Sequence, residues 1–319
     1  MKVLGIEATA HTFGVGIVDE KKVLANVKSM YTTEKGGMIP SEAAKHHEKV
    51  CMDMVKKALK EAKLTWEDID VISFSQGPGM APCLLVGMRT AKTLAKLHDK
   101  PLVGINHCVA HLTIGQMTTR AKDPVFVNVA GANTQIIALS GDYFRIFGET
   151  LDIGLGNAVD KFGREANIGF PAGPEIEKLS LQGKYVELPY VVKGMDLSFA
   201  GIVTKATRLL QNHKLEDICF SLQETTFAML VEVTERAVAH TGKKEVLMIG
   251  GVAVNKRLKQ MMEQMCKDRG ITCYTAPLGV AGDNGAMIAW QGLLQAEKKE
   301  VIDILPYQRT DEVQVTWMT

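Results

Sequence analysis

The hydrophobic pattern of the chain switches between short apolar runs and longer segments with helical spacing. Residues 1–24 and 124–147 share one pattern: an apolar run, a loop of small and polar residues, and a second run with alternating apolar positions. Each stretch is typical of two strands joined by a tight loop. Because the pattern occurs twice, we interpret it as a duplicated unit, with one copy in each of two lobes.

Helical and strand patterns alternate between and after these copies. Apolar residues recur at helical spacing over 40–63, 84–100 and 215–242, and buried-strand runs precede or separate them. This alternation predicts an α/β fold of two similar lobes with a ligand in the cleft between them. The predicted domains are an N-terminal lobe with a helical insertion (1–120), a C-terminal lobe (121–295) with a loop-rich insertion at 151–200, and a tail (296–319).

Size, charge and cysteine content narrow the class of protein. A chain of 319 residues exceeds what one hydrophobic core usually supports, which agrees with two lobes. The formal net charge of +1 gives no overall attraction to a polyanion, so a nucleic-acid partner would need a local basic patch or a helper subunit. The six cysteines form no CxxC pair, and no apolar run is as long as a membrane span. We therefore expect a cytoplasmic protein with reduced thiols and no membrane partner.

Three loops of small residues follow predicted strands and favour a nucleotide ligand. Small side chains at 8–10 and 131–134 let backbone N–H groups approach a phosphate closely. Gly250 and Gly251 leave space for a flat base, and the helix predicted after them favours negative charge. A plain turn is the alternative for each loop taken alone, but three in a duplicated frame indicate an ATP or adenylate ligand. The candidate contacts in these loops are Thr9, His11, Gly131, Ala132, Asn133, Gly250 and Gly251.

A histidine pair makes a metal site the next candidate. His107 and His111 are four positions apart, so on a helix both imidazoles lie on one face. The best third ligand is Asp283, which sits among glycines before a predicted helix. Two imidazoles and one carboxylate leave open coordination positions and suit Fe or Zn better than Mg. The alternative is a pair of capping or packing histidines. A zinc-peptidase interpretation fails, because Cys108 stands where the H-E-x-x-H motif requires glutamate.

The chain resembles, over essentially its whole length, the TsaD/KEOPS-type tRNA threonylcarbamoyladenosine transferases of the archaeal and eukaryotic branch. The resemblance rests on ten motifs in the family's order: GIEATAHTFGVGI, GGMIPSEAAKHH, SQGPGMAPCLLVGMRTAK, GINHCVAH, GLGNAVDKFGRE, PAGPEIEKL, DLSFAGI, GGVAVNKRL, GVAGDNGAMIAW and RTDEVQVTW. Members have the ASKHA fold of actin, hexokinase and the large heat-shock chaperones. The resemblance therefore implies the duplicated two-lobe fold that the pattern predicts.

The same resemblance implies a reaction and its site. A threonylcarbamoyl-adenylate made by a separate enzyme would donate its threonylcarbamoyl group to the adenosine beside the anticodon in ANN-reading tRNAs. His107, His111 and Asp283 would hold one Fe or Zn ion per subunit. The adenylate or ATP-type nucleotide would be contacted by Asn128, Val129, Ala130, Gly131, Ala132, Asp160, Gly173, Glu177 and Asn255. Glu7, His11 or the bound phosphate would take the proton of the attacking amine. The implied partners are tRNA, a KEOPS-type kinase subunit and small accessory or dimerisation subunits.

Two positions depart from the family pattern. Many relatives carry Tyr, a possible metal ligand, at the position of Asn128, and the common Ser-Gly-Gly of the second phosphate loop is Ala130-Gly131-Ala132 here. Two other functions remain as alternatives. One is an ATP-dependent small-molecule kinase on the same fold, which would need Mg and a catalytic carboxylate. The other is a nucleotide-gated assembly subunit without catalytic activity.

Overall fold

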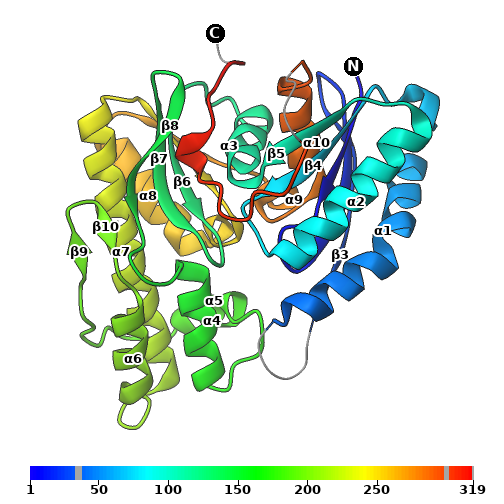
Figure 1. Cartoon of the computed structure of the whole chain (residues 1–319). Coiled ribbons are helices and arrows are strands. Elements are labelled where there is room, and N and C mark those ends of the chain that lie inside the picture. The colour runs from blue at the N-terminus through cyan, green and yellow to red at the C-terminus, as the bar shows by residue number, and fades with distance from the viewer. Residues whose placement is uncertain (33–37, 298–301, 318–319) are drawn as a thin grey trace. The chain divides into compact units, whose positions relative to one another are not determined.

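The computed structural model describes residues 1–32, 38–297 and 302–317, so residues 298–301 and 318–319 of the predicted tail lie outside the described part (Figure 1). The chain forms two compact units. Unit 1 comprises Met1–Ile114 and Asp283–Thr319, and unit 2 comprises Gly115–Gly282. Each unit contains a mixed five-stranded sheet, which confirms the predicted α/β class.

The sheet of unit 1 has the order β3-β2-β1-β4-β5. Its strands are β1 (Val3–Glu7), β2 (Thr12–Val18), β3 (Val23–Met30), β4 (Val71–Gly77) and β5 (Leu102–Asn106). β1, β2 and β3 are antiparallel neighbours, whereas β4 and β5 run parallel to β1. The helices are α1 (Pro40–Ala62), α2 (Ala81–His98), α3 (His107–Thr118), the last residues of which belong to unit 2, and α10 (Gly285–Leu294), with 3-10 turns η1 (Trp66–Asp68) and η3 (Thr310–Glu312).

The sheet of unit 2 has the order β12-β11-β6-β7-β8. Its strands are β6 (Val125–Val129), β7 (Thr134–Ser140), β8 (Tyr143–Glu149), β11 (Glu245–Ile249) and β12 (Thr272–Thr275). A short hairpin, β9 (Val192–Lys193) and β10 (Asp196–Leu197), forms a separate sheet. The helices are α4 (Leu155–Glu165), α5 (Gly173–Ser180), α6 (Ala200–Leu209), α7 (Leu215–Thr241), the 3-10 turn η2 (Gly251–Val254), α8 (Lys256–Asp268) and α9 (Leu278–Ala281).

The predicted duplication is confirmed by the strand order. In each unit a three-stranded antiparallel meander is extended by two parallel strands beside its first strand. The first two strands of each unit form an antiparallel hairpin, which closes at the pair Glu7 and Gly14 in unit 1 and at the pair Val129 and Thr134 in unit 2. Thus the loops after β1 and β6, where nucleotide contacts are predicted, occupy equivalent positions in their units.

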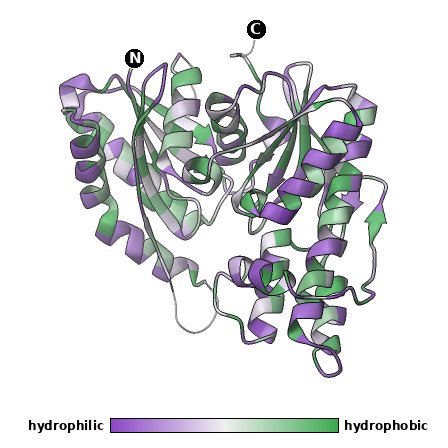
Figure 2. Cartoon of the chain, turned by 180° about the vertical axis from the view of Figure 1, so that it is seen from behind, coloured by the Kyte–Doolittle hydropathy of each residue, from purple (hydrophilic) through white to green (hydrophobic). Residues whose placement is uncertain are grey.

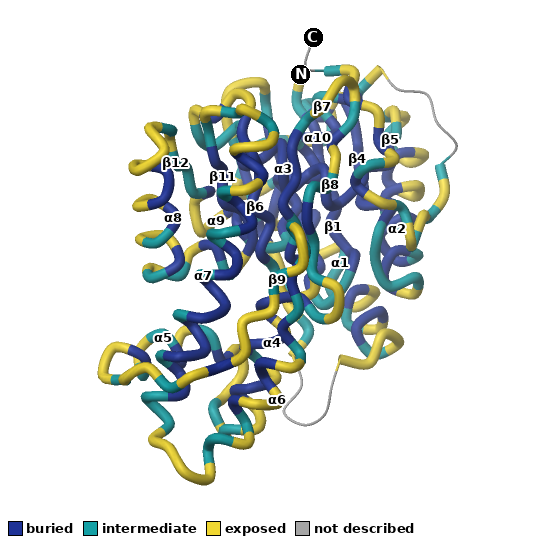
Figure 3. The backbone as a smooth tube through the Cα atoms, turned by 90° about the vertical axis from the view of Figure 1, so that its left-hand side faces the viewer, coloured by how far each residue is buried: buried dark blue, intermediate teal, exposed yellow. Residues whose placement is uncertain are grey.

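In both sheets the central strands are buried. Strands β1, β4, β6 and β11 are dark blue in Figure 3, and every residue of β1, β2, β4 and β6 is buried. Hydrophobic colour follows the strands in Figure 2, whereas the helices carry hydrophilic stretches. Parallel strands buried on both faces need continuous apolar sequence, which explains the runs that predicted them. Among the described residues, no helix is both long and apolar enough to cross a membrane.

Helix α10 packs directly on the sheet of unit 1 because both surfaces lack side chains where they meet. A Cβ atom added to Gly16 would lie 2.1 Å from the backbone N of Ala286, and one added to Gly285 would lie 2.1 Å from the backbone N of Gly16. No side chain fits at such distances, so glycine is required at both positions. This contact holds the start of α10, and the residues just before it, against β2.

Candidate metal and nucleotide sites

The histidine pair lies where α3 begins. Strand β5 ends at Asn106 and α3 starts at His107, with the Asn106 side-chain oxygen accepting a 3.0 Å hydrogen bond from the backbone N–H of Val109. Asparagine at this capping position satisfies an otherwise unpaired N–H of the first turn. The rings of His107 and His111 meet edge to face, with centroids 4.7 Å apart. The four-residue spacing therefore places both imidazoles on one face, as predicted.

Asp283 joins this pair from the loop before α10. Its Oδ1 lies 3.3 Å from Nε2 of His111 and 3.5 Å from Nε2 of His107. One ligand atom from each residue lies within 4.8 Å of the other two. In a tetrahedral site with metal–ligand bonds of about 2.0–2.1 Å, two ligand atoms lie about 3.3 Å apart. The two histidine–aspartate distances match this value, so the three residues form a candidate site for a metal ion held by two imidazoles and a carboxylate, with further positions open.

Glu7 lies on the other side of His107, at the end of β1. Its Oε2 is 2.9 Å from Nδ1 of His107, and its Oε1 accepts hydrogen bonds from the backbone N–H and hydroxyl of Thr9. The Glu7 side chain is fully buried. A carboxylate at Nδ1 orients the ring and keeps the proton on that nitrogen, which leaves Nε2 to face Asp283. Sequence reasoning named Glu7 only as a candidate base; the signal for this contact was an acid at the end of the first apolar strand.

The protonation of these side chains follows from their contacts. Burial acts to lower the pKa of His107, but the charge of Glu7, the hydrogen bond to Glu7 and the charge of Asp283 together raise it to about 9. Burial acts to raise the pKa of Asp283, but its hydrogen bond to His111 and the charges of the nearby histidines hold it well below its usual range. Asp283 is therefore an ionised carboxylate and His107 a protonated imidazole when no cation is present.

Cys108 follows His107 in the sequence, and His47 contacts the loop after β1. Cys108 is 4% exposed, and burial raises its pKa to about 11, so the thiol stays protonated and is a packing residue. His47, on α1, hydrogen-bonds through Nε2 to the carbonyl of Ala10 at 3.0 Å. Burial lowers the pKa of His47 to about 4, so its ring is neutral and Nε2 donates. His47 therefore supports the loop that carries Thr9 and His11, a contact that the sequence did not reveal. The side chain of Thr9 is buried and His11 is half-buried.

In unit 2, the predicted phosphate loop is a tight turn between β6 and β7. Asn128 and Val129 end β6, and the N–H of Ala130 donates to the carbonyl of Asn133 at 2.8 Å. The carbonyls of Ala130 and Gly131 accept from the N–H groups of Gly156 and Asn157 at the start of α4, which holds the turn in place. Gly131 and Ala132 are exposed, whereas Asn128 is buried and its side-chain oxygen has no hydrogen-bond partner.

Gly250 lies beside this turn because β11 pairs with β6. Its φ of 97° is in the region that glycine tolerates, and a Cβ atom there would lie 2.3 Å from the carbonyl oxygen of Val129. Gly251 is exposed and begins η2. The helix α8 does not follow these glycines directly, since the 3-10 turn η2 intervenes and Asn255 caps α8.

The other predicted nucleotide residues of unit 2 form two groups. Asn255 accepts from the N–H groups of Arg257 and Leu258 and donates to Gln223 at 2.8 Å. Glu177 on α5 accepts from the N–H of Lys256 at 3.0 Å, so these two predicted residues adjoin. Asp160 on α4 accepts from the N–H of Ala172 at 2.8 Å, next to Gly173, and burial raises the pKa of Asp160. The two carboxylates each have one oxygen engaged with backbone.

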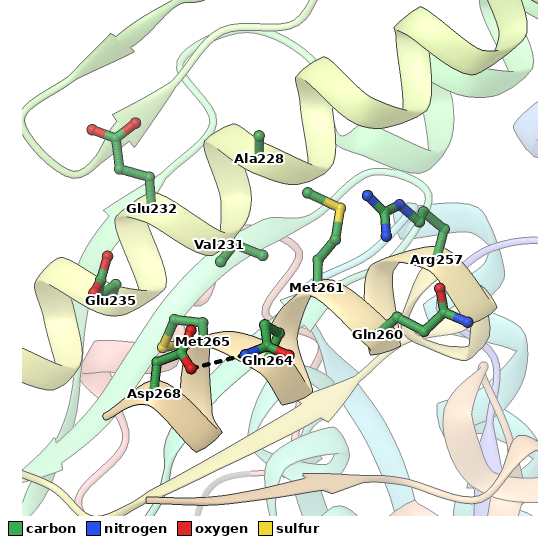
Figure 4. A pocket seen from close by; sticks show the side chains of 10 residues that line it. All are labelled: Ala228, Val231, Glu232, Glu235, Arg257, Gln260, Met261, Gln264, Met265 and Asp268. Carbon is green, nitrogen blue, oxygen red and sulfur yellow. Dashed lines mark hydrogen bonds between the residues drawn. The ribbon is translucent and has the colours of Figure 1, made fainter. Parts of the chain in front are cut away.

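A groove of about 580 Å³ lies elsewhere in unit 2, between α7 and α8 (Figure 4). The groove is lined by Ala228, Val231, Glu232, Glu235, Arg257, Gln260, Met261, Gln264, Met265 and Asp268. None of the predicted site residues lines it. Two of its three acids pair with arginines, Glu232 with Arg236 and Glu235 with Arg269 at 2.7 Å, and the third, Asp268, accepts a hydrogen bond from Gln264 at 2.8 Å.

Comparisons with known proteins identify the family of the chain. The family model described as "TsaD: tRNA N6-adenosine threonylcarbamoyltransferase" matches residues 22–290. A curated protein of the same description from Thermococcus sibiricus is 55% identical over 99% of this chain and 100% of its own length. A "Probable bifunctional tRNA threonylcarbamoyladenosine biosynthesis protein" from Methanosarcina mazei is 50% identical over 99% of this chain, which spans 59% of that protein.

Solved structures with little sequence similarity share the fold. HypF from T. kodakarensis has a TM-score of 0.63 at 14% identity, over 93% of this chain and 48% of its own. The ROK hexokinase of Thermus thermophilus has a TM-score of 0.50 at 15% identity, over 93% of this chain and 99% of its own. These likenesses establish a shared α/β fold and nothing about substrate.

Proposed function

The chain belongs to the tRNA N6-adenosine threonylcarbamoyltransferase family and is a transferase, and from this premise we propose its donor, its acceptor and its metal. The donor is threonylcarbamoyl-AMP, supplied by a separate enzyme. The acceptor is the exocyclic amine of the adenosine beside the anticodon in ANN-decoding tRNAs. The observation that carries the proposal is the convergence of His107, His111 and Asp283, whose ligand atoms lie within 4.8 Å of one another.

The proposed metal is one Fe or Zn ion, bound by these three residues. When bound, it supplies a Lewis acid that polarises a donor oxygen and stabilises the charge that develops as AMP departs. Glu7 holds the His107 ring through Nδ1, and the glycine contact between β2 and α10 holds the loop of Asp283. Because the mixed anhydride of the donor is already activated, the protein needs no nucleophilic side chain.

The residues of unit 2 are the proposed adenylate contacts. Asn128 to Asn133 offer backbone N–H groups of a small-residue turn to the phosphate, and the unpaired, buried side-chain oxygen of Asn128 is an acceptor that a ligand donor would satisfy. The free oxygens of Asp160 and Glu177 suit ribose hydroxyls. Gly173, Gly250 and Gly251 add no side chain, and Asn255 is proposed to lie by the adenine. Thr9 and His11 of unit 1 are proposed as further contacts.

The proton of the attacking amine needs an acceptor. Both oxygens of Glu7 are engaged and its side chain is fully buried, which favours a positioning role over that of a general base. His11 is half-buried. We therefore assign proton removal to His11 or to the phosphate of the donor.

The proposed setting is a cytoplasmic KEOPS-type complex with a kinase subunit and small accessory subunits. The net charge of +1 supports dependence on partners for tRNA capture. A basic cluster at the start of α8 is partly neutralised, because Arg257 pairs with Glu224 at 2.5 Å and Lys259 with Glu263 at 3.7 Å. The bifunctional name of the M. mazei relative indicates that such a transferase and a second activity occur together.

Reconstitution with threonylcarbamoyl-AMP, partner subunits and an ANN-decoding tRNA tests the proposal. Nucleoside mass spectrometry is expected to show threonylcarbamoyladenosine with the wild-type chain and a loss of at least 100-fold with Asp283→Ala. No product from the complete mixture would favour the assembly-subunit alternative. Phosphorylation of a small molecule in place of tRNA modification would favour the kinase alternative.

A further inference from the structure

The C-terminal tail, residues 302–317, contacts the start of α3, the helix that carries His107 and His111. It is drawn in red in Figure 1. Asn106 is the residue that joins them. Its side-chain oxygen caps α3, while its side-chain Nδ2 donates to the side-chain oxygen of Gln308 at 3.1 Å and to the carbonyl of Arg309 at 3.3 Å. One amide group thus fixes both the first turn of α3 and the tail.

A second contact lies two residues farther along each segment. The side chain of Thr310, which is 2% exposed, hydrogen-bonds to the Cys108 thiol. Asn106 and Cys108 are the neighbours of His107 on either side in the sequence, so the tail holds both flanks of the first metal ligand.

The tail is anchored at its other end to β4 and the loop after it. The N–H of Leu305 donates to the carbonyl of Gln76 at 2.6 Å, and the N–H of Gly79 donates to the carbonyl of Pro306 at 3.1 Å. A Cβ atom on Gly77 would lie 1.8 Å from the carbonyl oxygen of Leu305, so the tail runs against backbone that carries no side chain. Met80 follows Gly79 in the loop after β4, and its backbone N–H donates to the carbonyl of Thr9. The backbone N–H of Thr9 in turn donates to the side chain of Glu7.

We propose that Gln308 and Thr310 are positioning residues for the metal site, acting through Asn106 and Cys108 on the orientation of His107. The inference rests on the proposed metal function of His107, His111 and Asp283. Residues around a metal's ligands set how well the ligands are prepared to bind, and their loss typically costs tenfold or more in affinity. Gln308 and Thr310 are one step farther away, so we expect a smaller effect.

The test compares Co²⁺ binding to the metal-free, full-length wild type and the double variant Gln308→Met/Thr310→Val. Both changes keep side-chain size and remove only the hydrogen-bonding group. The expected result is a rise in the Co²⁺ Kd of threefold or more, with a changed d–d absorption band. Tyr307→Ala is the matched control in the same segment, because Tyr307 is 93% exposed, and its Kd is expected to stay within twofold of wild type.

A tail that stabilises the fold without affecting the metal ligands gives a different result. The double variant would then unfold at lower denaturant concentration, yet its Kd would stay below threefold of wild type, and that outcome overturns the inference. If near-ultraviolet circular dichroism shows that the double variant is not folded, the two single variants are measured instead. For each of them, a Co²⁺ Kd at least twofold above that of wild type supports the inference, and a smaller rise overturns it. A wild-type chain that binds no Co²⁺ at all would instead contradict the proposed metal function itself.

Discussion

Oε2 of Glu7 lies 2.9 Å from Nδ1 of His107, although the two residues are 100 positions apart in the chain. This contact turns His107 so that its other nitrogen faces Asp283, 3.5 Å away. It also explains why the pKa of His107 is raised, against the effect of burial. The relationship links the first strand of unit 1 to the proposed metal chemistry.

Replacing Glu7 by glutamine tests this link. Glu7→Gln keeps the shape but removes the charge, so the His107 ring loses its strongest partner. We expect metal affinity to fall about 10- to 100-fold, measured by competition with a chromogenic chelator. NMR titration of the metal-free variant should show the pKa of His107 below the value of about 9 in the wild type. The control is Glu42→Gln, an exposed acid that pairs with Lys45, for which affinity should not change.

The raised pKa of His107 predicts how the stability of the metal-free protein depends on pH. A histidine whose pKa rises from 6.5 unfolded to about 9 folded stabilises the fold fully below pH 6.5, and this contribution is lost as pH rises through 9. Its size is on the order of 3 kcal/mol. Urea unfolding of metal-free wild type and His107→Gln should therefore show a stability difference that shrinks between pH 6.5 and 9. A difference that grows with pH would contradict this electrostatic account.

Asn255 has two roles that substitutions should separate. Asn255→Ala removes the cap of α8, which is expected to cost about 1 kcal/mol of unfolding free energy, and it also removes the proposed adenine contact. Asn255→Asp keeps an oxygen for the N–H groups of Arg257 and Leu258 but loses the amide donor. Because the Asn255 amide also donates to Gln223, we expect Asp to keep the cap of α8 but lose this bond, and to weaken AMP binding about tenfold, as judged by calorimetry. Equal AMP affinity for Asp and wild type would place the adenine elsewhere.

The contact between β2 and α10 should not tolerate a methyl group. Gly285→Ala would bring a Cβ atom to 2.1 Å from the backbone of Gly16, so the helix must shift away from the sheet. We expect a loss of about 3 kcal/mol or more in unfolding free energy and weaker metal binding, because Asp283 precedes this helix. Gly279→Ala, where an added Cβ meets nothing within 4 Å, is the matched control and should change neither quantity.

Local patterns in the sequence predict much of the fold and part of the site. The repeated hairpin pattern leads to the two equivalent sheets, and the spacing of His107 and His111 leads to a shared helix face, because both depend on neighbours in the chain. The role of Glu7 and the cap contact of Asn106 with Gln308 are not predictable in this way. Each joins residues at least 100 positions apart, so it arises only when the strands pair and the tail packs.

The packing of α10 illustrates the same limit. The segment 278–294 predicts a glycine-rich loop and a helix, but nothing in it shows that the helix packs on strands formed by the first 18 residues. A hydrophobicity pattern does not show the importance of Gly16 and Gly285, because each is needed only for having no side chain where β2 and α10 touch.

The central claim is that His107, His111 and Asp283 bind a single metal ion. The most direct test is a crystal structure of protein purified without chelators, with anomalous data collected at the iron and zinc edges. We expect one anomalous peak within about 2.0–2.2 Å of Nε2 of both histidines and an oxygen of Asp283. An empty site in crystals soaked with either metal, or a peak held by other residues, would contradict the account.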